Sequence, residues 1–357
     1  MPQPSLLPFD LARELGHERL LIAQRPEVGL TAVIALHDTT LGPAVGGTRM
    51  RAYEDLGGAV ADALRLSSAM TAKAAFANLP FGGGKAVLVG DPRRDKSEAL
   101  LEAYGGLVEE LGGRFFTGGD MGIEGRDLEV ISRQTRHVGH TPANAGVDAA
   151  DLTAIGVLAA METVADRLGR SLADCTVAIQ GLGEVGGRLA LRLADAGARL
   201  VVADIDRERL VASAQQTGAR VVAPEEILEV ECDLLSPNAA GGVVTWENAS
   251  RLQCRAIVGA ANNPLASPEL AAILLERGVL YAPDFVVNAG GLLSVLFETG
   301  ALDEQGVVER VRRIGSDLEA LLERATTELS TPLAVARAVV RERLEAARAA
   351  REAAAGV

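Results

Sequence analysis

The sequence has few aromatic residues, few cysteines and no long hydrophobic run. Aromatic residues make up 3% of the 357 residues and hydrophobic residues 48%, so any core is built mainly from Ala, Val, Leu and Ile, which is typical of helices packed on strands. The length fits about two domains at ~150 residues each. Cys175, Cys232 and Cys254 are widely spaced and odd in number, which excludes a disulfide framework or a paired zinc motif, and we expect buried free thiols. No stretch approaches the ~18 apolar residues of a membrane span.

The sequence also lacks an excess of positive charge. Its 35 Lys and Arg against 48 Asp and Glu give a net charge of -13, which argues against nucleic acid as a partner. The first fifteen residues contain no basic start followed by an apolar core, so they do not resemble a secretory leader. We therefore expect a cytoplasmic protein with a small-molecule substrate, and neither a membrane, a nucleic acid nor a bound metal.

Glycine is abundant and unevenly distributed. The 39 glycines concentrate near residues 42–47, 82–84, 105–125, 181–187, 241–242 and 290–291. Between these stretches, apolar runs of strand length (32–36, 86–89, 177–180, 200–203 and 256–258) alternate with helical patterns such as 59–70 and 188–196. The alternation predicts parallel sheets covered by helices, and the glycine-rich stretches are candidate site loops.

Two segments indicate how the domains are divided. Residues 140–151 have small and polar side chains and no helical or strand period, which predicts a domain boundary. The last 26 residues begin at Pro332, after the possible cap Thr331, and their pattern predicts one amphipathic helix. This helix either returns to the first domain or makes a subunit contact.

The clearest single motif is TVAIQGLGEVGGRLALRLADAGARLVVADID, residues 176–206. It contains an apolar strand, the GxGxxG glycines Gly181, Gly183 and Gly186, a helix, and a second strand that ends at Asp204. Such glycines permit a tight turn, close approach of the backbone to a pyrophosphate, and packing of the helix on the strand. A helix N-terminus then favours the phosphates, so the segment predicts dinucleotide binding.

Asp204 bears on which dinucleotide is bound. A carboxylate at the end of the second strand can accept the ribose hydroxyls and repels a 2'-phosphate, which favours NAD over NADP. Two alternatives remain open at this point. Asp204 can instead act as a turn or helix cap, and Arg207 or Arg209 can support NADP if either folds back.

Lys73 and Lys85 lie among small and apolar neighbours. Burying an ammonium group without a partner is costly and tends to lower its pKa. Two ammonium groups in one cleft would each favour the neutral form of the other, which suits one anion-binding lysine and one basic lysine. The alternative is that both are surface lysines whose stems cover apolar area.

A series of longer motifs runs in order over nearly the whole chain: LGPAVGGTRM, DALRLSSAMTAKAA, LPFGGGKAVLVGDP, FFTGGDMG, LTAIGV, QGLGEVGG, VGAANNPL and LYAPDFVVNAGGL. Through these motifs the sequence resembles a known family, the glutamate/leucine/phenylalanine/valine dehydrogenases. The resemblance implies an α/β fold with two domains across a cleft. Residues 1–143 and 332–357 would form a mixed-sheet domain for substrate binding and oligomerisation, and residues 144–331 a Rossmann-type NAD domain. Relatives are homo-oligomers.

The resemblance implies reversible NAD-dependent oxidative deamination of an L-amino acid to a 2-oxo acid and ammonium. Lys85 would be the general base, which requires its pKa to fall from ~10.4 to about 7–8 with help from burial and from Lys73. Asp120 would exchange a proton with the substrate nitrogen; without the resemblance, an Asx turn would be the better interpretation of this residue. The remaining implied roles are substrate binding by Lys73, Gly46, Gly47 and Asn288, and cofactor binding by Gly181, Gly183, Glu184, Val185, Gly186, Asp204, Ile205, Asn262, Thr153 and Asn288.

The side-chain pocket is expected to be apolar. Glutamate-specific relatives carry a lysine where this chain has Val45, and an apolar residue there would leave a distal carboxylate unpaired. Gly118 leaves room for a bulky side chain, which favours leucine, phenylalanine or a similar residue over valine. Val311 and Ile314 either contribute to the same pocket or belong to the core. Asn238 stands where many relatives have cysteine.

Two other functions stay open. The chain could be a catalytically inactive NAD-binding regulator of the same fold, although the presence of Lys73, Lys85, Asp120 and Asn288 together argues against this. It could also be an oxidoreductase that acts on 2-hydroxy acids through a histidine base. The histidines available are His17, His37, His137 and His140, and none lies in a motif of that kind.

Overall fold

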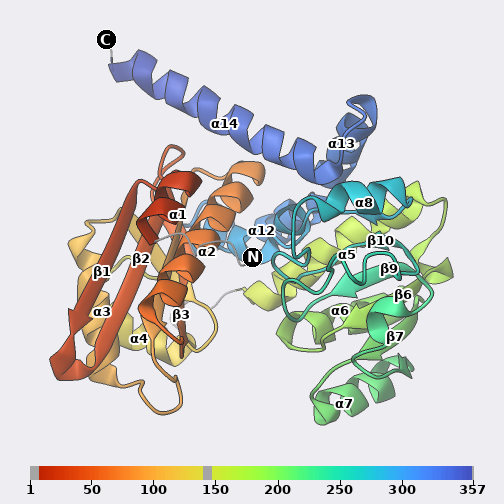
Figure 1. The fold of residues 1–357 in the computed structure, drawn as a ribbon, viewed down its shortest axis with the longest axis horizontal. Helices are drawn as coiled ribbons and strands as arrows, with labels where there is room; N and C mark the ends of the chain where they lie inside the picture. Colours follow the sequence, from red (N-terminus) through yellow and green to blue (C-terminus); the bar gives the residue numbers. More distant parts are fainter. Residues whose placement is uncertain (1–7, 140–146, 356–357) are drawn as a thin grey trace. The chain divides into compact units, whose positions relative to one another are not determined.

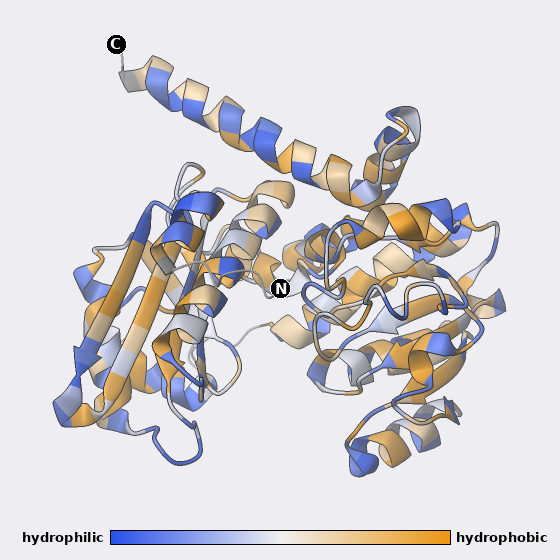
Figure 2. Cartoon of the chain, viewed as in Figure 1, coloured by the Kyte–Doolittle hydropathy of each residue, from blue (hydrophilic) through white to orange (hydrophobic). Residues whose placement is uncertain are grey.

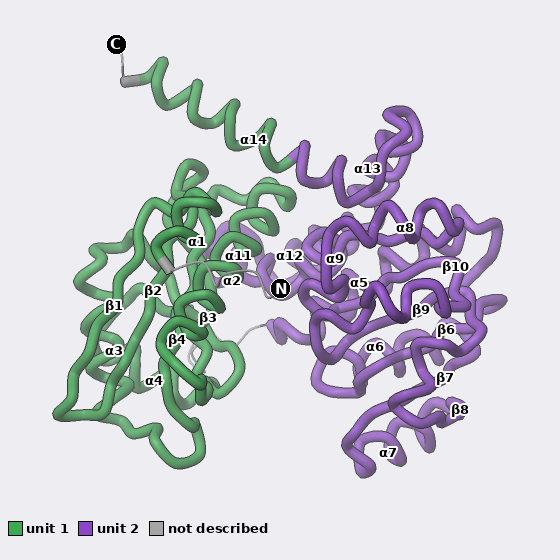
Figure 3. Tube along the Cα trace, viewed as in Figure 1, with its two compact units in different colours: residues 1–145, 340–357 green, residues 146–339 purple. Residues whose placement is uncertain are grey.

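The computed structural model describes residues 8–139 and 147–355. The chain forms two compact units, one of residues 1–145 and 340–357 and the other of residues 146–339 (Figure 3). The boundary expected at 143/144 lies outside the described residues, and residues 332–339 belong to the second of these units. The expected α/β fold class, with one mixed and one parallel sheet, is confirmed.

The first unit is built on a five-stranded mixed sheet in the order β1-β2-β4-β3-β5 (Figure 1). Its strands are β1 (Arg19–Arg25), β2 (Leu30–Asp38), β3 (Ala44–Arg51), β4 (Gly82–Val89) and β5 (Phe115–Gly119). β1, β2 and β4 pair antiparallel, whereas β3 pairs parallel with both β4 and β5. The strand sequences are nearly continuous in apolar and small residues because both faces of the sheet are covered by helices.

Helices cover the two faces of this sheet. α1 (Pro8–Leu15) and α2 (Leu56–Phe76) pack on one face, and α3 (Glu98–Glu110) and α4 (Gly125–Ser132) pack on the other. Side chains alternate between the faces, so that Ala35 and Val87 contact α2 while Ile34 and Ala86 belong to the core on the α3 side. The strands are the most hydrophobic segments of the unit (Figure 2). α2 approaches β4 so closely that a Cβ at Gly83 would lie 2.1 Å from the backbone nitrogen of Thr71.

The second unit has a six-stranded parallel sheet in the order β11-β10-β9-β6-β7-β8. The strands are β6 (Thr176–Gln180), β7 (Arg199–Ala203), β8 (Arg220–Val221), β9 (Cys232–Pro237), β10 (Cys254–Ile257) and β11 (Leu280–Tyr281). α5 (Ala149–Arg167) precedes the first strand, and the helices between the strands are α6 (Glu184–Asp195), α7 (Arg207–Thr217) and α8 (Leu270–Glu276). The strand order reverses beside β6, which is the place where open α/β sheets bind their ligands.

Short helices and one long helix complete the chain. They are α9 (Asp284–Val287), α10 (Gly290–Leu293), α11 (Val295–Glu298), α12 (Glu304–Arg312), α13 (Ile314–Thr327) and α14 (Pro332–Ala355). The predicted C-terminal helix is confirmed as α14, and the hydroxyl of Thr331 caps it by accepting a hydrogen bond from Ala334 N at 3.1 Å. No helix in the described ranges has both the length and the apolar composition that a membrane span requires.

The last part of α14 belongs to the first unit. The Arg343 guanidinium donates to the carbonyls of Ala75, at 2.7 Å, and Phe76 at the end of α2. The Arg348 guanidinium pairs with the buried carboxylate of Asp38 at 2.5 Å. Of the two destinations considered for this helix, the structure therefore shows the return to the first domain.

The three cysteines are buried free thiols, as expected from their spacing. Burial raises the pKa of Cys232 and of Cys254 to about 12, so both remain protonated at neutral pH. Val311 and Ile314 are also buried, and they pack against Gly156 of α5, where an added Cβ would lie 2.7 Å from Ile314 Cδ1. This contact supports the core interpretation of the two residues.

Acid is expected to destabilise the first unit through His17. The ring donates from Nε2 to Leu64 O, and burial followed by the neighbouring His37 lowers the pKa of His17 to about 4. The unfolded chain binds this proton near pH 6.5 and the folded chain only near pH 4, so stability falls as the pH drops through that window. Allowing for the ring's partial exposure, the loss is about 2 kcal/mol. Urea unfolding at pH 7 and pH 4.5 measures it; equal losses in wild type and His17→Gln would contradict the assignment.

Candidate active site and dinucleotide site

The sheet of the first unit brings Lys85 and Asp120 together. Lys85 lies in the middle of β4, and Asp120 follows the last residue of β5, with β3 between the two strands. Lys85 Nζ lies 2.6 Å from Asp120 Oδ2, and the lysine side chain is only 8% exposed. The Asx turn considered as the alternative is therefore not the main use of the Asp120 side chain, because its carboxylate accepts from a buried ammonium group.

The strand register places this pair in an ordered patch on the α2 face of the sheet. β3 residues pair with β5 at Gly47 and Gly118, and with β4 at Thr48 and Ala86. Lys85, Gly47 and Gly118 consequently lie side by side on one face, with Asp120 two residues beyond Gly118. A Cβ at Gly118 would meet no atom within 4 Å, so the backbone there borders open space.

The pKa values of the pair are shifted by their surroundings. Burial lowers the pKa of Lys85, and the Asp120 carboxylate opposes this without cancelling it. Burial alone would raise the pKa of Asp120, but the charges of Lys85 and Arg49 outweigh it and keep the pKa below its ordinary value. The site thus combines a lysine that loses its proton easily with a carboxylate that stays ionised.

Arg49 is a site residue that the sequence analysis missed. Its Nε donates to Asp120 Oδ2 at 3.0 Å, the same oxygen that Lys85 contacts, and its Nη1 lies 3.1 Å from Asp62 Oδ2. The positive charge of Arg49 lowers the pKa of Lys85, an effect that we had expected from Lys73. The motif GGTRM places Arg49 on the same face of β3 as Gly47, two positions earlier, but the same alternation also places Arg51 there.

Lys73 lies in the last turn of α2, half-buried, on the helix that covers the face of Lys85. Val45 lies in β3, two residues before Gly47, and pairs with Gly83 and Phe116. Gly46 and Gly47 leave no room for side chains, since a Cβ at Gly46 would lie 1.8 Å from the Gly84 carbonyl oxygen.

Another lysine, Lys96, fixes the segment that follows Asp120. Lys96 Nζ donates to Gly122 O at 3.1 Å and to Asp127 Oδ2 at 2.7 Å. The Met50 amide also donates to Met121 O at 2.8 Å, which ties the segment to β3. These contacts keep Asp120 in register with Lys85.

The glycine-rich turn of the second unit has the geometry of a phosphate-binding loop. Gly181 has a φ of +89°, which disfavours other residues, and a Cβ at Gly186 would lie 2.0 Å from the Gly181 carbonyl oxygen. Gly183 is the N-cap of α6 and provides no side-chain cap for the helix amides. A Cβ at Gly183 would contact only the end of the Arg209 side chain, whose Nη1 would lie at 3.6 Å. The residues present thus fit a dinucleotide pyrophosphate.

Asp204 has backbone partners. Its Oδ2 accepts from Leu182 N at 2.5 Å and its Oδ1 accepts from Asp206 N at 2.7 Å. The cap role considered as an alternative is therefore present, and it ties the glycine turn to the end of β7. Ionised carboxylate oxygens can accept further hydrogen bonds, so the ribose role is compatible with these contacts. The neighbouring Ile205 side chain is 93% exposed.

Asn288 follows α9 and is 4% exposed. Its Nδ2 donates to Ala260 O at 3.0 Å and to Asn262 Oδ1 at 2.9 Å, which fixes the orientation of the amide. Its Oδ1 has no partner among the residues that the structure describes. A buried acceptor without a donor fits a carboxamide N–H of a bound nicotinamide. Thr153, one turn into α5, donates to Ala149 O at 2.8 Å.

Asn238 supports the same loop. Its Nδ2 donates to Ser236 O at 2.9 Å and its Oδ1 accepts from Ala260 N at 2.9 Å. The residue that departs from the family pattern therefore joins the end of β9 to the segment that carries Asn262.

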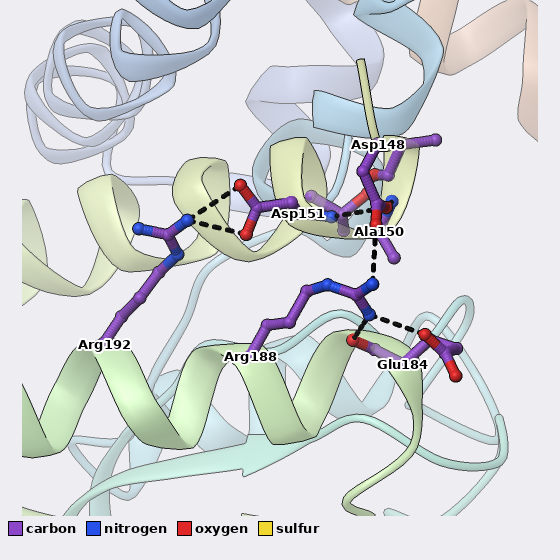
Figure 4. A network of polar contacts seen from close by, with 8 residues as sticks. Asp148, Ala150, Asp151, Glu184, Arg188 and Arg192 are labelled. Atoms are coloured by element: carbon purple, nitrogen blue, oxygen red, sulfur yellow. Dashed lines mark hydrogen bonds and ion pairs between the residues drawn. The ribbon is translucent and has the colours of Figure 1, made fainter. Parts of the chain in front are cut away.

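The N-terminal turns of α5 and α6 are joined by ion pairs (Figure 4). The Arg188 guanidinium lies 2.6 Å from Asp148 Oδ2 and 2.6 Å from Glu184 Oε2. Arg192 contacts both oxygens of Asp151, at 2.6 and 2.8 Å. The helix that begins at the glycine turn is thereby fixed to the helix that carries Thr153. Glu184, an expected cofactor residue, pairs with Arg188 in this network.

The expected site residues fall into two groups, each within one unit. The first unit holds Val45, Gly46, Gly47, Lys73, Lys85, Gly118 and Asp120, and the second holds Thr153, Gly181, Gly183, Glu184, Val185, Gly186, Asp204, Ile205, Asn262 and Asn288. In the described ranges, no cluster of three or more His, Cys, Asp or Glu side chains is arranged to hold a metal ion. His17 and His37 bond to Ser67 and Thr71, in the α1, α2 and β2 packing.

Comparison with known proteins agrees with this geometry. The family description "Glu/Leu/Phe/Val dehydrogenase, dimerisation domain" matches residues 17–137, and "Glutamate/Leucine/Phenylalanine/Valine dehydrogenase" matches residues 147–207 and 202–352. Leucine dehydrogenase of Thermoactinomyces intermedius is 38% identical over 347 residues, covering 96% of this chain and 95% of that protein. Phenylalanine dehydrogenase of Lysinibacillus sphaericus is 40% identical over 330 residues, covering 90% and 87%.

A solved structure extends the likeness to the whole fold. The crystal structure of L-tryptophan dehydrogenase from Nostoc punctiforme matches with a TM-score of 0.81 at 39% identity, covering 96% of this chain and 99% of that chain. The resemblance seen in the sequence is confirmed, which argues against the alternative of a 2-hydroxy-acid oxidoreductase. The chain belongs to the Glu/Leu/Phe/Val dehydrogenase family of amino-acid dehydrogenases.

Proposed function

We propose that the protein catalyses the reversible NAD-dependent oxidative deamination of a large apolar L-amino acid. An L-amino acid, NAD and water would give a 2-oxo acid, ammonium, NADH and a proton. The observation that carries the proposal is the buried contact of 2.6 Å between Lys85 Nζ and Asp120 Oδ2. An ionised carboxylate beside a lysine with a lowered pKa provides two proton-transfer groups of different affinity, as this reaction requires.

Each side chain has a distinct part in this proposal. Asp120 takes a proton from the substrate ammonium group, because hydride cannot easily leave a carbon beside a positive nitrogen. Lys85 in its neutral form then takes a proton from the water that attacks the imine carbon. Lys73 binds the substrate carboxylate, together with backbone amides near Gly46 and Gly47. Bound NAD supplies the hydride acceptor.

The second unit would hold the coenzyme. The uncapped N-terminus of α6 at Gly183 suits the pyrophosphate, and Asp204 suits the adenosine ribose. The unpaired Oδ1 of Asn288 suits the nicotinamide carboxamide. The regulator alternative keeps these binding groups and loses turnover, and the intact Lys85 and Asp120 pair favours the enzyme.

The substrate is proposed to be leucine, phenylalanine or another large apolar amino acid. Val45 offers no charge to a distal carboxylate, and the backbone at Gly118 borders open space on the same face. The leucine, phenylalanine and tryptophan dehydrogenases among the relatives support this class. The match to a dimerisation domain over residues 17–137 supports a homo-oligomer.

A substrate screen tests the proposal. Purified protein is mixed with NAD and each apolar L-amino acid at alkaline pH, and the NADH absorbance band is followed. We expect turnover with large apolar side chains and little with glutamate. Coenzyme binding without turnover on any amino acid would favour the regulator, and activity confined to valine or alanine would contradict the pocket argument.

Lys73→Ala is expected chiefly to raise KM for the amino acid. Loss of a charge-assisted contact to the carboxylate is worth roughly 1.5–3 kcal/mol, or about 10- to 150-fold. Initial rates over a range of amino-acid concentrations separate KM from kcat. Lys73→Arg keeps the charge and serves as the control; a large fall in kcat with unchanged KM would contradict carboxylate binding.

Asp204→Asn is expected to narrow the preference for NAD over NADP. The amide keeps an acceptor for one backbone N–H but removes the charge that repels a 2'-phosphate, so we expect the ratio of kcat/KM values to fall about tenfold or more. Parallel assays with the two coenzymes measure the ratio. A wild-type ratio that favours NADP would contradict the NAD assignment outright.

A further inference from the structure

One oxygen of Asp120 is shared by two cations. Asp120 Oδ2 lies 2.6 Å from Lys85 Nζ and 3.0 Å from Arg49 Nε, whose side chain is only 15% exposed. Burial alone would lower the pKa of Arg49, but Asp120 and Asp62 outweigh it and raise the pKa. Arg49 is therefore a fixed positive charge that is linked to Lys85 through the carboxylate of Asp120.

The other end of the Arg49 guanidinium is held by Asp62. Its Nη1 lies 3.1 Å from Asp62 Oδ2, and the Tyr53 hydroxyl donates to the same oxygen at 2.6 Å. Burial and the Asp62 charge raise the pKa of Tyr53, so the hydroxyl stays a donor. A continuous row of contacts thus runs from Tyr53 through Asp62, Arg49 and Asp120 to Lys85.

The elements packed around Lys85 contribute few other charges. β5 is followed by Asp120, and β3 carries Arg49. α2 carries Asp62, Lys73 and the exposed Arg65. On β2, His37 is held between Thr71 and Leu15, and burial lowers its pKa, which keeps it neutral. The charges that act most on Lys85 are those of Asp120, Arg49 and Asp62, in that order.

We propose that Arg49 is a positioning residue that locks Asp120 onto Lys85 and, anchored by Asp62, sets the proton affinity of this pair. The inference concerns the ionisation of two groups whose catalytic use rests on the proposed function. Arg49 acts through Asp120, because it shares that residue's oxygen with Lys85. Loss of its charge leaves Lys85 facing an unshared carboxylate, which favours the protonated lysine.

Lysine is rare in this chain, which makes a direct measurement practical. Lysine occurs only at positions 73, 85 and 96, so the other 32 of the 35 basic residues are arginines. Full-length protein labelled with ¹³Cε-lysine therefore gives three side-chain resonances, assigned by Lys73→Arg and Lys96→Arg. The Lys85 resonance can then be titrated by NMR without substrate or turnover.

The variants are chosen so that a loss of charge and a loosening of the packing around Lys85 shift its titration midpoint in different directions. Arg49→Gln is expected to raise the Lys85 titration midpoint by about one pH unit, and Arg49→Lys to leave it within a few tenths of wild type. Asp62→Asn removes a negative charge and is expected to lower the midpoint. A merely loosened site would admit water and raise it in both Arg49→Gln and Asp62→Asn, which would overturn the proposal.

Arg51→Gln is the matched control. Arg51 lies two residues further along the same face of β3, but it is exposed and its Nε donates to Ala52 O at 3.4 Å. Its guanidinium lies 4.9 Å from the centre of the Tyr53 ring, so it meets the row of contacts at the end far from Lys85. The Lys85 midpoint is expected to stay unchanged in this variant. A shift equal to that of Arg49→Gln would mean that general charge, and not the shared oxygen, sets the proton affinity.

Kinetics provide the second readout. The acidic limb of kcat/KM for the amino acid is expected to move to higher pH by the same amount as the NMR midpoint in Arg49→Gln, with restoration in Arg49→Lys. An unmoved NMR midpoint in Arg49→Gln overturns the proposal. Wild-type protein that deaminates no amino acid yet shows the NMR shifts would sink the proposed function and leave the Arg49 inference standing.

Discussion

Lys85→Ala is expected to lower kcat for oxidative deamination about 10³-fold, within the range of 10²–10⁴ typical of general acid–base groups. The ammonium group is buried and faces Asp120 at 2.6 Å, so no other described side chain can take its place without a rearrangement of β4. Stopped-flow and steady-state assays that follow NADH formation at several pH values measure the fall in kcat. The acidic limb that reports Lys85 should disappear from the residual activity.

Two controls accompany this prediction. NADH binding, followed by its fluorescence, is expected to be unchanged in Lys85→Ala, because the coenzyme groups lie in the other unit. Asp120→Asn should also lower kcat strongly, through loss of the proton acceptor, even though loss of its charge makes deprotonation of Lys85 easier. Near wild-type turnover in Lys85→Ala would remove this lysine from the chemistry.

The sequence was sufficient to predict the elements that carry local signals. The glycine turn at Gly181, the C-terminal helix from Pro332 and the glycine patch before Lys85 all follow from spacing or composition, and the structure has each of them. The resemblance supplied the pairing of Lys85 with Asp120, which are separated by 35 positions in the sequence. Local pattern alone could not have supplied it, because the contact depends on the register of three strands.

Arg49 illustrates what the sequence could not predict. Nothing in its spacing distinguishes it from Arg51, two residues later on the same strand face. The difference arises from tertiary packing: Asp62 on α2 and Asp120 after β5 both reach Arg49, whereas the exposed Arg51 lies over the Tyr53 ring. Asp204 is similar, since its cap contacts to Leu182 and Asp206 depend on how the glycine turn meets β7.

Gly46→Ala is expected to cause the largest loss of stability among single substitutions in the site. A Cβ at this position would lie 1.8 Å from the carbonyl oxygen and 2.7 Å from the carbonyl carbon of Gly84. β3 is paired on both sides, with β4 and β5, so the clash cannot be relieved by moving a flexible side chain. We expect a loss of about 3–5 kcal/mol, at the upper end of overpacking effects.

The shift in Tm provides the measurement, with Gly106→Ala as the matched control. A loss of that size corresponds to roughly 10 °C in calorimetry of a unit of this size. Gly106 lies within α3, and a Cβ there would meet no atom within 4 Å, so its replacement should raise Tm by about 1–3 °C. Because Gly84 precedes Lys85, Gly46→Ala should also lower kcat at temperatures where the protein stays folded. An unchanged Tm in Gly46→Ala would show that the strands can separate at this point, and it would remove the steric reason for the paired glycines.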